Sequence, residues 1–309
     1  MMPRLNEDTR GVFVISATPF RPDGSLDLEG TEQLLDFYLG CGVSGITILG
    51  VMGEANKMTD AESADFAGRA LRCAAQKLPV IVGVTHSALT ALRDLSHSVM
   101  DLGASGVMLQ PMAGLKSDDA VFRYFEQVFE AIGADIPVVY QDFPQASNVH
   151  LSPAAWSRMV HEFPDLVMLK HEDCPGLPKL TKIREMEREG RQRRVSILTG
   201  NNGLYFPQEL HRGADGAMTG FAFPDVLVRV YDLFTAGRAG EAEDLFDRYL
   251  PINRHEQQLG FGLPIRKEIL RRRGALRHAT ARKPVYGLTD VDVAELDRLL
   301  ERIEPDIRG

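Results

Sequence analysis

Cysteine clusters, an excess of positive charge and long apolar runs are all missing from this chain of 309 residues, and each absence excludes a class of protein. The three cysteines form no Cys-x-x-Cys pair and no zinc-type Cys/His spacing, which excludes a disulfide framework and a zinc module. No run of 18 apolar residues occurs, so no membrane span is predicted. The first residues are polar and lack the apolar core of a signal peptide, which favours a cytoplasmic location.

Charge and composition narrow the choice of partner. The chain has 35 lysines and arginines against 43 acidic residues, a net charge of −8, which argues against general binding of nucleic acid or of an anionic membrane. Its 44% hydrophobic and 25% charged residues are typical of globular proteins. A small molecule is therefore the expected partner.

Short apolar runs recur along the first two thirds of the sequence. Each is rich in β-branched residues or bounded by glycine and proline, and none alternates polar with apolar residues, as in a parallel sheet buried on both faces. The eight runs are residues 11–17, 45–49, 79–84, 106–110, 137–140, 166–170, 195–198 and 216–219.

Stretches with helical periodicity lie between these runs. They are residues 27–39, 59–75, 88–102, 118–132, 152–162 and 175–189, followed after the eighth run by 226–236, 239–252, 264–273 and 290–303. Eight strands alternating with helices predict an α/β fold, a (β/α)8 TIM barrel, with a C-terminal helical extension. The alternative, a doubly wound open sheet, usually has a GxGxxG turn, which is absent here. We expect a barrel over residues 1–225 and a helical region over residues 226–309.

In such a barrel the functional residues follow the C-terminal ends of the strands. Lys170 closes an apolar run, so its stem starts inside the barrel. Burial disfavours an ammonium ion and leaves a neutral amine, which can attack a ketone and form a Schiff base. The alternative is a lysine at the rim of the barrel, paired with Glu172 or Asp173.

Other strand ends supply candidate acids and bases. Tyr140 ends the fifth run, beside the sixth, where a phenol could relay protons to Lys170. His171 and Glu172 are further candidate proton carriers. The structural alternatives are a half-buried tyrosine, a capping histidine and a surface glutamate.

Two glycine-containing turns are candidate substrate-binding segments. In the first, LGVMGEAN, residues Val51, Met52, Gly53 and Glu54 follow Gly50, and backbone amides exposed by such a turn suit a carboxylate. The second is TGNNG, with Gly200, Asn201 and Asn202, and Thr18 follows the first run. Plain strand-to-helix turns and helix caps are the alternatives.

Together these residues resemble the dihydrodipicolinate synthase/N-acetylneuraminate lyase family of Schiff-base-forming barrels, over nearly the whole chain. The resemblance is carried by Gly50-x-x-Gly53-Glu54, Tyr140 and Lys170 in that order. It implies that Lys170 forms the Schiff base, that Tyr140 assists it, and that the turn at 50–54 holds the carboxylate of a 2-oxo acid. It also implies a homotetramer that needs no metal and no cofactor.

Departures from the synthase subgroup of this family point to another substrate. That subgroup has hydroxyl residues where Val51 and Met52 stand, a tyrosine pair where Met112 and Ala113 stand, and an arginine after the catalytic tyrosine, which is missing here. The set instead resembles the sugar-acid dehydratases of the family. We therefore expect dehydration of a 2-keto-3-deoxy sugar acid, most readily a pentonate converted to 2-oxoglutarate semialdehyde. An aldolase acting on the same imine, and a barrel that binds a sugar acid without turnover, are the alternatives.

Overall fold

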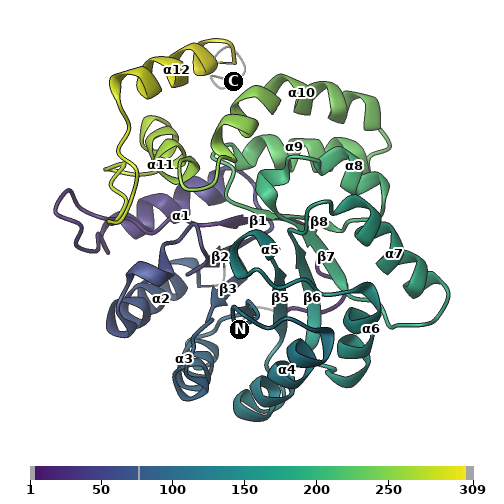
Figure 1. The fold of residues 1–309 in the computed structure, drawn as a ribbon. Helices are drawn as coiled ribbons and strands as arrows, with labels where there is room; N and C mark the ends of the chain where they lie inside the picture. The colour runs from purple at the N-terminus through teal and green to yellow at the C-terminus, as the bar shows by residue number, and fades with distance from the viewer. Residues whose placement is uncertain (1–3, 76, 304–309) are drawn as a thin grey trace.

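The computed structural model describes residues 4–75 and 77–303 and contains a closed barrel of eight parallel strands in sequence order (Figure 1). The strands are β1 (Gly11–Ile15), β2 (Gly45–Ile48), β3 (Val80–Gly83), β4 (Gly106–Leu109), β5 (Val138–Asp142), β6 (Leu166–His171), β7 (Ser196–Thr199) and β8 (Gly216–Thr219). Every strand residue is buried, which is why the runs show no polar alternation. The predicted barrel is confirmed.

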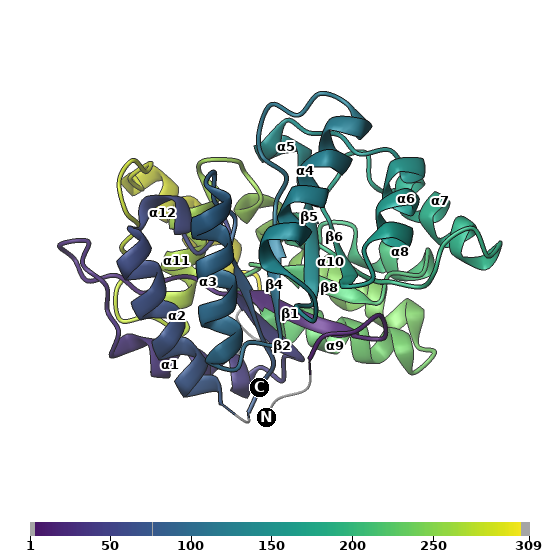
Figure 2. The same ribbon diagram turned by 90° about the horizontal axis from the view of Figure 1, so that it is seen from below.

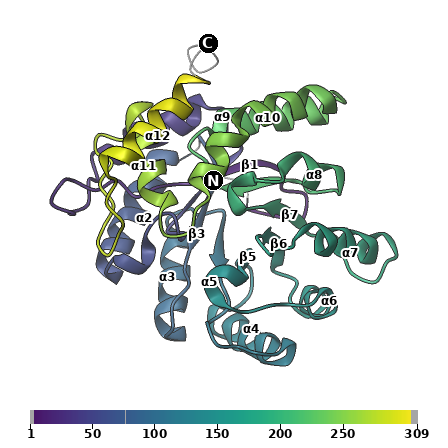
Figure 3. The ribbon, with the colours of Figure 1, turned by 45° about the horizontal axis from the view of Figure 1, so that its top comes forward.

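Helices surround the barrel, as the view from the tilted top shows (Figure 3). Those between strands are α1 (Gly30–Gly40), α2 (Asp60–Ala74), α3 (Leu89–Asp101), α4 (Asp118–Ile132), α5 (Pro144–Ser147), α6 (Pro153–Glu162), α7 (Leu177–Arg188) and α8 (Phe206–His211), with the short 3-10 turns η1 (Ala55–Lys57) and η2 (Asn201–Gly203). Local sequence fixes several of their starts. Thr59 and Glu62 form a capping box at α2, and Ser152 caps α6 with Pro153 at its first position.

Four helices follow β8: α9 (Pro224–Thr235), α10 (Ala239–Glu256), α11 (Gly262–Arg272) and α12 (Asp290–Glu301). Helix α9 packs on β1, and α10 packs on α9. Helix α11 lies beside α1 in two views (Figures 1 and 2), where the Gln33 side chain donates to the Gly274 carbonyl. The C-terminal helical extension is thus present, and its division from the barrel at residue 225 stays a prediction.

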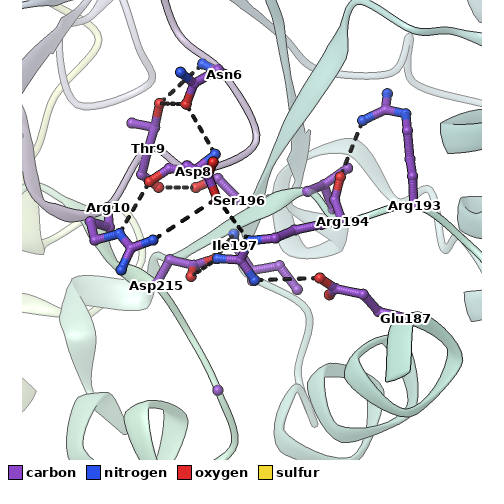
Figure 4. Close-up of polar contacts among 12 residues, drawn as sticks. Asn6, Asp8, Thr9, Arg10, Glu187, Arg193, Arg194, Ser196, Ile197 and Asp215 are labelled. Atoms are coloured by element: carbon purple, nitrogen blue, oxygen red, sulfur yellow. Dashed lines mark hydrogen bonds and ion pairs between the residues drawn. The ribbon is translucent and has the colours of Figure 1, made fainter. Parts of the chain in front are cut away.

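Charged side chains pair with one another at the N-terminal end of the barrel (Figure 4). Asp215, just before β8, pairs with Arg184 and Arg194 at 2.5 Å each, and Arg194 also reaches Asp8 of the N-terminal segment. These contacts lie opposite the strand ends where the candidate residues gather. Among residues 4–75 and 77–303, the helices are all too short or too polar to cross a membrane.

Candidate active site

Lys170 and Glu172 form a buried pair near the C-terminal end of β6. The Lys170 Nζ atom is 2.9 Å from Glu172 Oε2, and the lysine side chain is only 5% exposed. The pair named as the structural alternative therefore exists, but it is buried rather than at a solvated rim. A carboxylate at this distance can accept the ammonium proton and leave the neutral amine that attacks a carbonyl carbon.

Gln141 of β5 completes the cluster. Its register partner is Lys170, and neighbours in a parallel ladder share one face of the sheet. The Gln141 Nε2 atom donates to Glu172 Oε2 at 2.8 Å, so a single carboxylate oxygen contacts both the lysine and the amide. Lys170, Glu172 and Gln141 are called the catalytic trio below.

The turn after β7 makes room for Glu172. A Cβ atom at Gly200 would lie 2.2 Å from Glu172 Cγ, closer than any two carbons can approach without a bond. Asn201 Nδ2 donates to the Glu172 backbone carbonyl at 2.9 Å. Gly200 and Asn201 therefore hold Glu172 in place, and neither is positioned by these contacts as a substrate ligand.

Tyr140 lies on the opposite face of β5. Its ring packs on Phe125 of α4 and Trp156 of α6, with centroids 5.1 and 5.7 Å apart, in the layer between barrel and helices. Its hydroxyl is buried and without a partner among the described residues, and burial together with Asp142 raises its pKa well above 10. This geometry does not agree with the prediction that Tyr140 relays protons to Lys170. Strand alternation is the reason, because Tyr140 shares its face with Leu169 and not with Lys170.

His171 also faces the helices. Its Nδ1 atom is 3.6 Å from Asp142 Oδ2, and its Nε2 atom lies 2.9 Å from the Gly176 carbonyl oxygen. Burial alone would lower the pKa of His171, but the hydrogen bond and charge of Asp142 outweigh it and raise that pKa. Lys179 of α7 pairs with the same carboxylate at 2.6 Å. His171 thus joins a network that ties β5 and β6 to α7, behind the catalytic trio.

A cavity of about 890 Å³ opens at the C-terminal ends of β2 to β5 and extends between α2 and α3. Its lining includes Gly50, Val51, Thr85, Gln110 and Gln141. Its volume suits a small organic molecule. Gln141 is the member of the catalytic trio that lines the cavity, and Lys170 is its register partner on the neighbouring strand β6.

The turn at residues 50–54 borders this cavity. Within the described residues, the backbone N–H groups of Val51, Met52 and Gly53 have no hydrogen-bond acceptor. Thr18 Oγ1 donates to the Gly53 carbonyl at 2.6 Å and so fixes the turn from below. Unpaired amides in a fixed turn are suited to an anionic oxygen. Binding of a carboxylate at this turn stays a prediction.

Glu54 and Asn202 point away from the cavity. Glu54 has a left-handed backbone with φ of 57°, and its carboxylate is fully buried against Lys267 of α11 at 2.5 Å. Asn202 Nδ2 reaches Asn253 and Glu256 of α10. Both residues connect the barrel to the C-terminal helices, and these contacts do not support the prediction that their side chains bind substrate.

No metal site was found in the described part of the chain, where no three His, Cys, Asp or Glu side chains converge suitably. The residue that sequence reasoning missed is Gln141. Alternation along β5 admits either Tyr140 or Gln141 on the inner face, and only the register with Lys170 decides between them.

A buried lysine at the C-terminal mouth of a (β/α)8 barrel, beside a carboxylate, defines a class of enzymes that bind carbonyl compounds covalently. Residues 8–303 match the model of the dihydrodipicolinate synthetase family, and the chain belongs to that family. It is a lyase that acts through a lysine Schiff base, and its family acts on small keto acids.

Individual relatives carry two kinds of name. L-2-keto-3-deoxyarabonate dehydratase of Azospirillum brasilense is 31% identical over 300 residues, 96% of this chain and 95% of that protein. A 4-hydroxy-tetrahydrodipicolinate synthase of Chlorobium luteolum is 28% identical over 298 residues, 94% of this chain and 96% of that protein. A crystal structure described as dihydrodipicolinate synthase from Rhodopseudomonas palustris has a TM-score of 0.95 and 44% identity, covering 97% of this chain and 100% of that one.

Proposed function

We propose that the protein dehydrates a 2-keto-3-deoxy sugar acid, with L-2-keto-3-deoxyarabonate as substrate and 2-oxoglutarate semialdehyde as product. The observation that carries the proposal is the catalytic trio, in which Glu172 Oε2 lies 2.9 Å from the Lys170 amine and 2.8 Å from the Gln141 amide. It joins a nucleophile, a general base and a neutral hydrogen-bond donor in one buried group.

The first stage forms the imine. Glu172 takes a proton from the Lys170 ammonium, and the neutral amine adds to the C2 carbonyl of the substrate. The resulting carbinolamine loses its hydroxyl as water, with a proton returned by Glu172, and a protonated imine remains. The unpaired amides of Val51, Met52 and Gly53 bind the C1 carboxylate meanwhile.

The second stage removes water from C3 and C4. The protonated imine draws electrons from C3, so Glu172, again a carboxylate, removes a C3 proton and an enamine forms. The enamine expels the C4 hydroxyl, which leaves as water with the proton that Glu172 now carries. A proton then moves from C5 to C3, the enol at C4 and C5 becomes the aldehyde, and hydrolysis frees Lys170.

Several features support a dehydratase over the other activities in the family. Val51 and Met52 supply no hydroxyl to the turn, and the inner position at the end of β5 holds Gln141, an amide that does not exchange protons as a phenol does. Proton transfer then falls to Glu172. The dehydratase name of the Azospirillum relative agrees with this reading, whereas the synthase names of other relatives do not.

The test combines trapping with product analysis. Borohydride reduction in the presence of substrate should add the mass of the reduced substrate at Lys170, and Lys170→Ala should form no adduct and show no turnover. Exposed Lys182 is paired with Glu185 on α7 and with no other residue of the described structure. It gives the matched control Lys182→Ala, which should behave as wild type. A panel of 2-keto-3-deoxy pentonates and hexonates should yield a semialdehyde that retains every substrate carbon.

Other products would point elsewhere. Pyruvate and an aldehyde would identify an aldolase, and the absence of any adduct would leave a barrel that binds sugar acids without turnover. Either result contradicts the proposed dehydration.

We further propose a homotetramer in the cytoplasm, working without a cofactor. The family resemblance supports the tetramer. Light scattering coupled to size-exclusion chromatography tests it, and a mass of one or two chains would contradict it.

A further inference from the structure

A fully buried ion pair that the mechanism does not use lies behind the turn at residues 50–54. Lys267 of α11 has no exposed surface, and its Nζ atom is 2.5 Å from Glu54 Oε1. Lysine is almost never fully buried unless it is paired. Removing its ammonium from water costs free energy, which the contacts of the buried group must offset. Its contacts indicate what it does there.

The ammonium of Lys267 has three N–H groups, and three oxygen atoms lie close enough to partner them. Besides Glu54, it donates to the carbonyl oxygens of Thr18 at 2.9 Å and of Thr280 at 2.8 Å. It also lies 4.5 Å from the centre of the Phe20 ring. One side chain thereby links the end of β1, the turn and the segment after α11.

The same contacts hold the turn from two directions. Thr18, whose carbonyl accepts from Lys267, donates its hydroxyl to the Gly53 carbonyl at 2.6 Å. Glu54 Oε2 accepts from Lys57 Nζ at 3.0 Å and from the Arg282 backbone N–H at 2.8 Å. Gly53 is thus tied to the C-terminal extension through Thr18, and Glu54 is tied to it directly.

The positive charge of Lys267 also affects how an anion can bind at the turn. Glu54 follows directly after the amides that would hold the substrate carboxylate, and its own carboxylate is fully buried. Two anions in a region of low dielectric repel each other strongly. A buried cation against Glu54 offsets that repulsion.

We propose that Lys267 is a positioning residue for carboxylate recognition, which neutralises Glu54 and holds the turn at residues 50–54 in the form that accepts a 2-oxo acid. The proposal rests on the proposed function, because it takes the carboxylate to bind at this turn. It makes α11 and the segment after it part of the substrate site.

A pH dependence follows. Burial lowers the pKa of Lys267 to about 8, against the opposing effect of Glu54, while Lys57 and Arg282 lower it further. Below that pH the ammonium of Lys267 neutralises Glu54, and above it Glu54 keeps Lys57, at 3.0 Å, as its one cationic partner in the described structure. Arg282 itself is paired with Glu62. KM for the oxo acid should therefore rise between pH 7 and pH 9, with a smaller change in kcat.

The experiment measures KM and kcat at pH 7 and pH 9 for wild type, Lys267→Met, Lys267→Arg and the double variant Glu54→Gln/Lys267→Met. Lys267→Met should raise KM at pH 7 by about tenfold or more, the effect of losing one charged partner. The double variant removes both charges, so its KM should return toward the wild-type value and no longer rise at pH 9. Lys182→Met is the control for loss of a paired lysine at a distance.

Thermal unfolding of each variant separates folding from binding. If Lys267→Met does not fold, the wild type and the neutral double variant still test the proposal through their pH profiles. A wild-type KM that stays constant from pH 7 to pH 9, or a double variant as impaired as Lys267→Met, overturns it. If wild type forms no borohydride adduct, the proposed function fails instead, whereas normal adducts with an unchanged KM in Lys267→Met overturn only the role of Lys267.

Discussion

Two adjacent residues at the end of β5 have different roles, one in packing and one in the proposed chemistry. Tyr140 points to the helices and Gln141 to Glu172, so substitutions at these neighbours should have opposite consequences. Tyr140→Phe removes a buried hydroxyl without a partner in the described structure, and we expect kcat to fall by less than about tenfold, whereas loss of a general acid or base costs ~10²-fold or more. Its thermal stability should be unchanged or higher.

Gln141→Leu is the matched variant one position along the strand. It removes the amide from Glu172 at similar volume, and we expect kcat to fall by about 10²-fold while the borohydride adduct still forms. Steady-state kinetics of both variants in one assay checks the contrast. A large loss in Tyr140→Phe with near-normal activity in Gln141→Leu would return the proton transfer to the phenol.

Lys170 was predictable from the sequence because a charged residue that ends an apolar run is itself an anomaly. Its burial beside Glu172 follows the same pattern. The face of Tyr140, His171 and Glu54 was not predictable, since alternation fixes only which residues share a face. Which face turns inward depends on the register between β5 and β6 and on the packing of α4, α6 and α11, which are distant in sequence.

At the scale of elements, the sequence predicted the bounds of a helix well where its periodicity or its capping residues were strong. The prediction for residues 118–132 agrees with α4, and the capping box at Thr59 forms as expected. Helix α8 was not predicted, because a six-residue helix has too few turns to show periodicity. The helix exists because tertiary packing buries it, and that burial has a measurable consequence at Glu209.

Glu209 of α8 should make the stability of the protein depend on pH. Burial raises its pKa to about 7 from the ordinary 4.5, and its Oε2 atom has no partner in the described structure. An acid whose pKa is higher in the folded state stabilises the fold at low pH, and that contribution is lost as the pH rises from 4.5 through 7. Between pH 5 and pH 8 the free energy of unfolding of wild type should therefore fall by about 2–3 kcal/mol relative to that of Glu209→Gln.

Urea unfolding of both proteins at the two pH values measures this difference. The exposed carboxylate of Glu241, paired with Arg238, supplies the control Glu241→Gln, for which the difference between the two pH values should be small. If the difference in unfolding free energy between wild type and Glu209→Gln does not change with pH, the pKa of Glu209 is not raised in the folded protein and the prediction is wrong.

At the scale of the whole molecule, we expect the N-terminal end of the barrel to contribute to stability and the C-terminal end to catalysis. One variant tests whether these two roles are separate. Asp215 joins the start of β7, the start of β8 and the N-terminal segment through Arg194 and the Ile197 N–H (Figure 4). It also pairs with Arg184 of α7. Asp215→Asn keeps the shape but leaves the mostly buried Arg184 with Glu187 as its one anionic partner in the described structure, so the free energy of unfolding should fall by about 2 kcal/mol. Because the catalytic trio lies at the other end of the strands, kcat and KM at 25 °C should stay at wild-type values. Denaturant unfolding and steady-state kinetics on the same preparation measure both, and a changed KM without a loss of stability would mean that the N-terminal end of the barrel also shapes the substrate site.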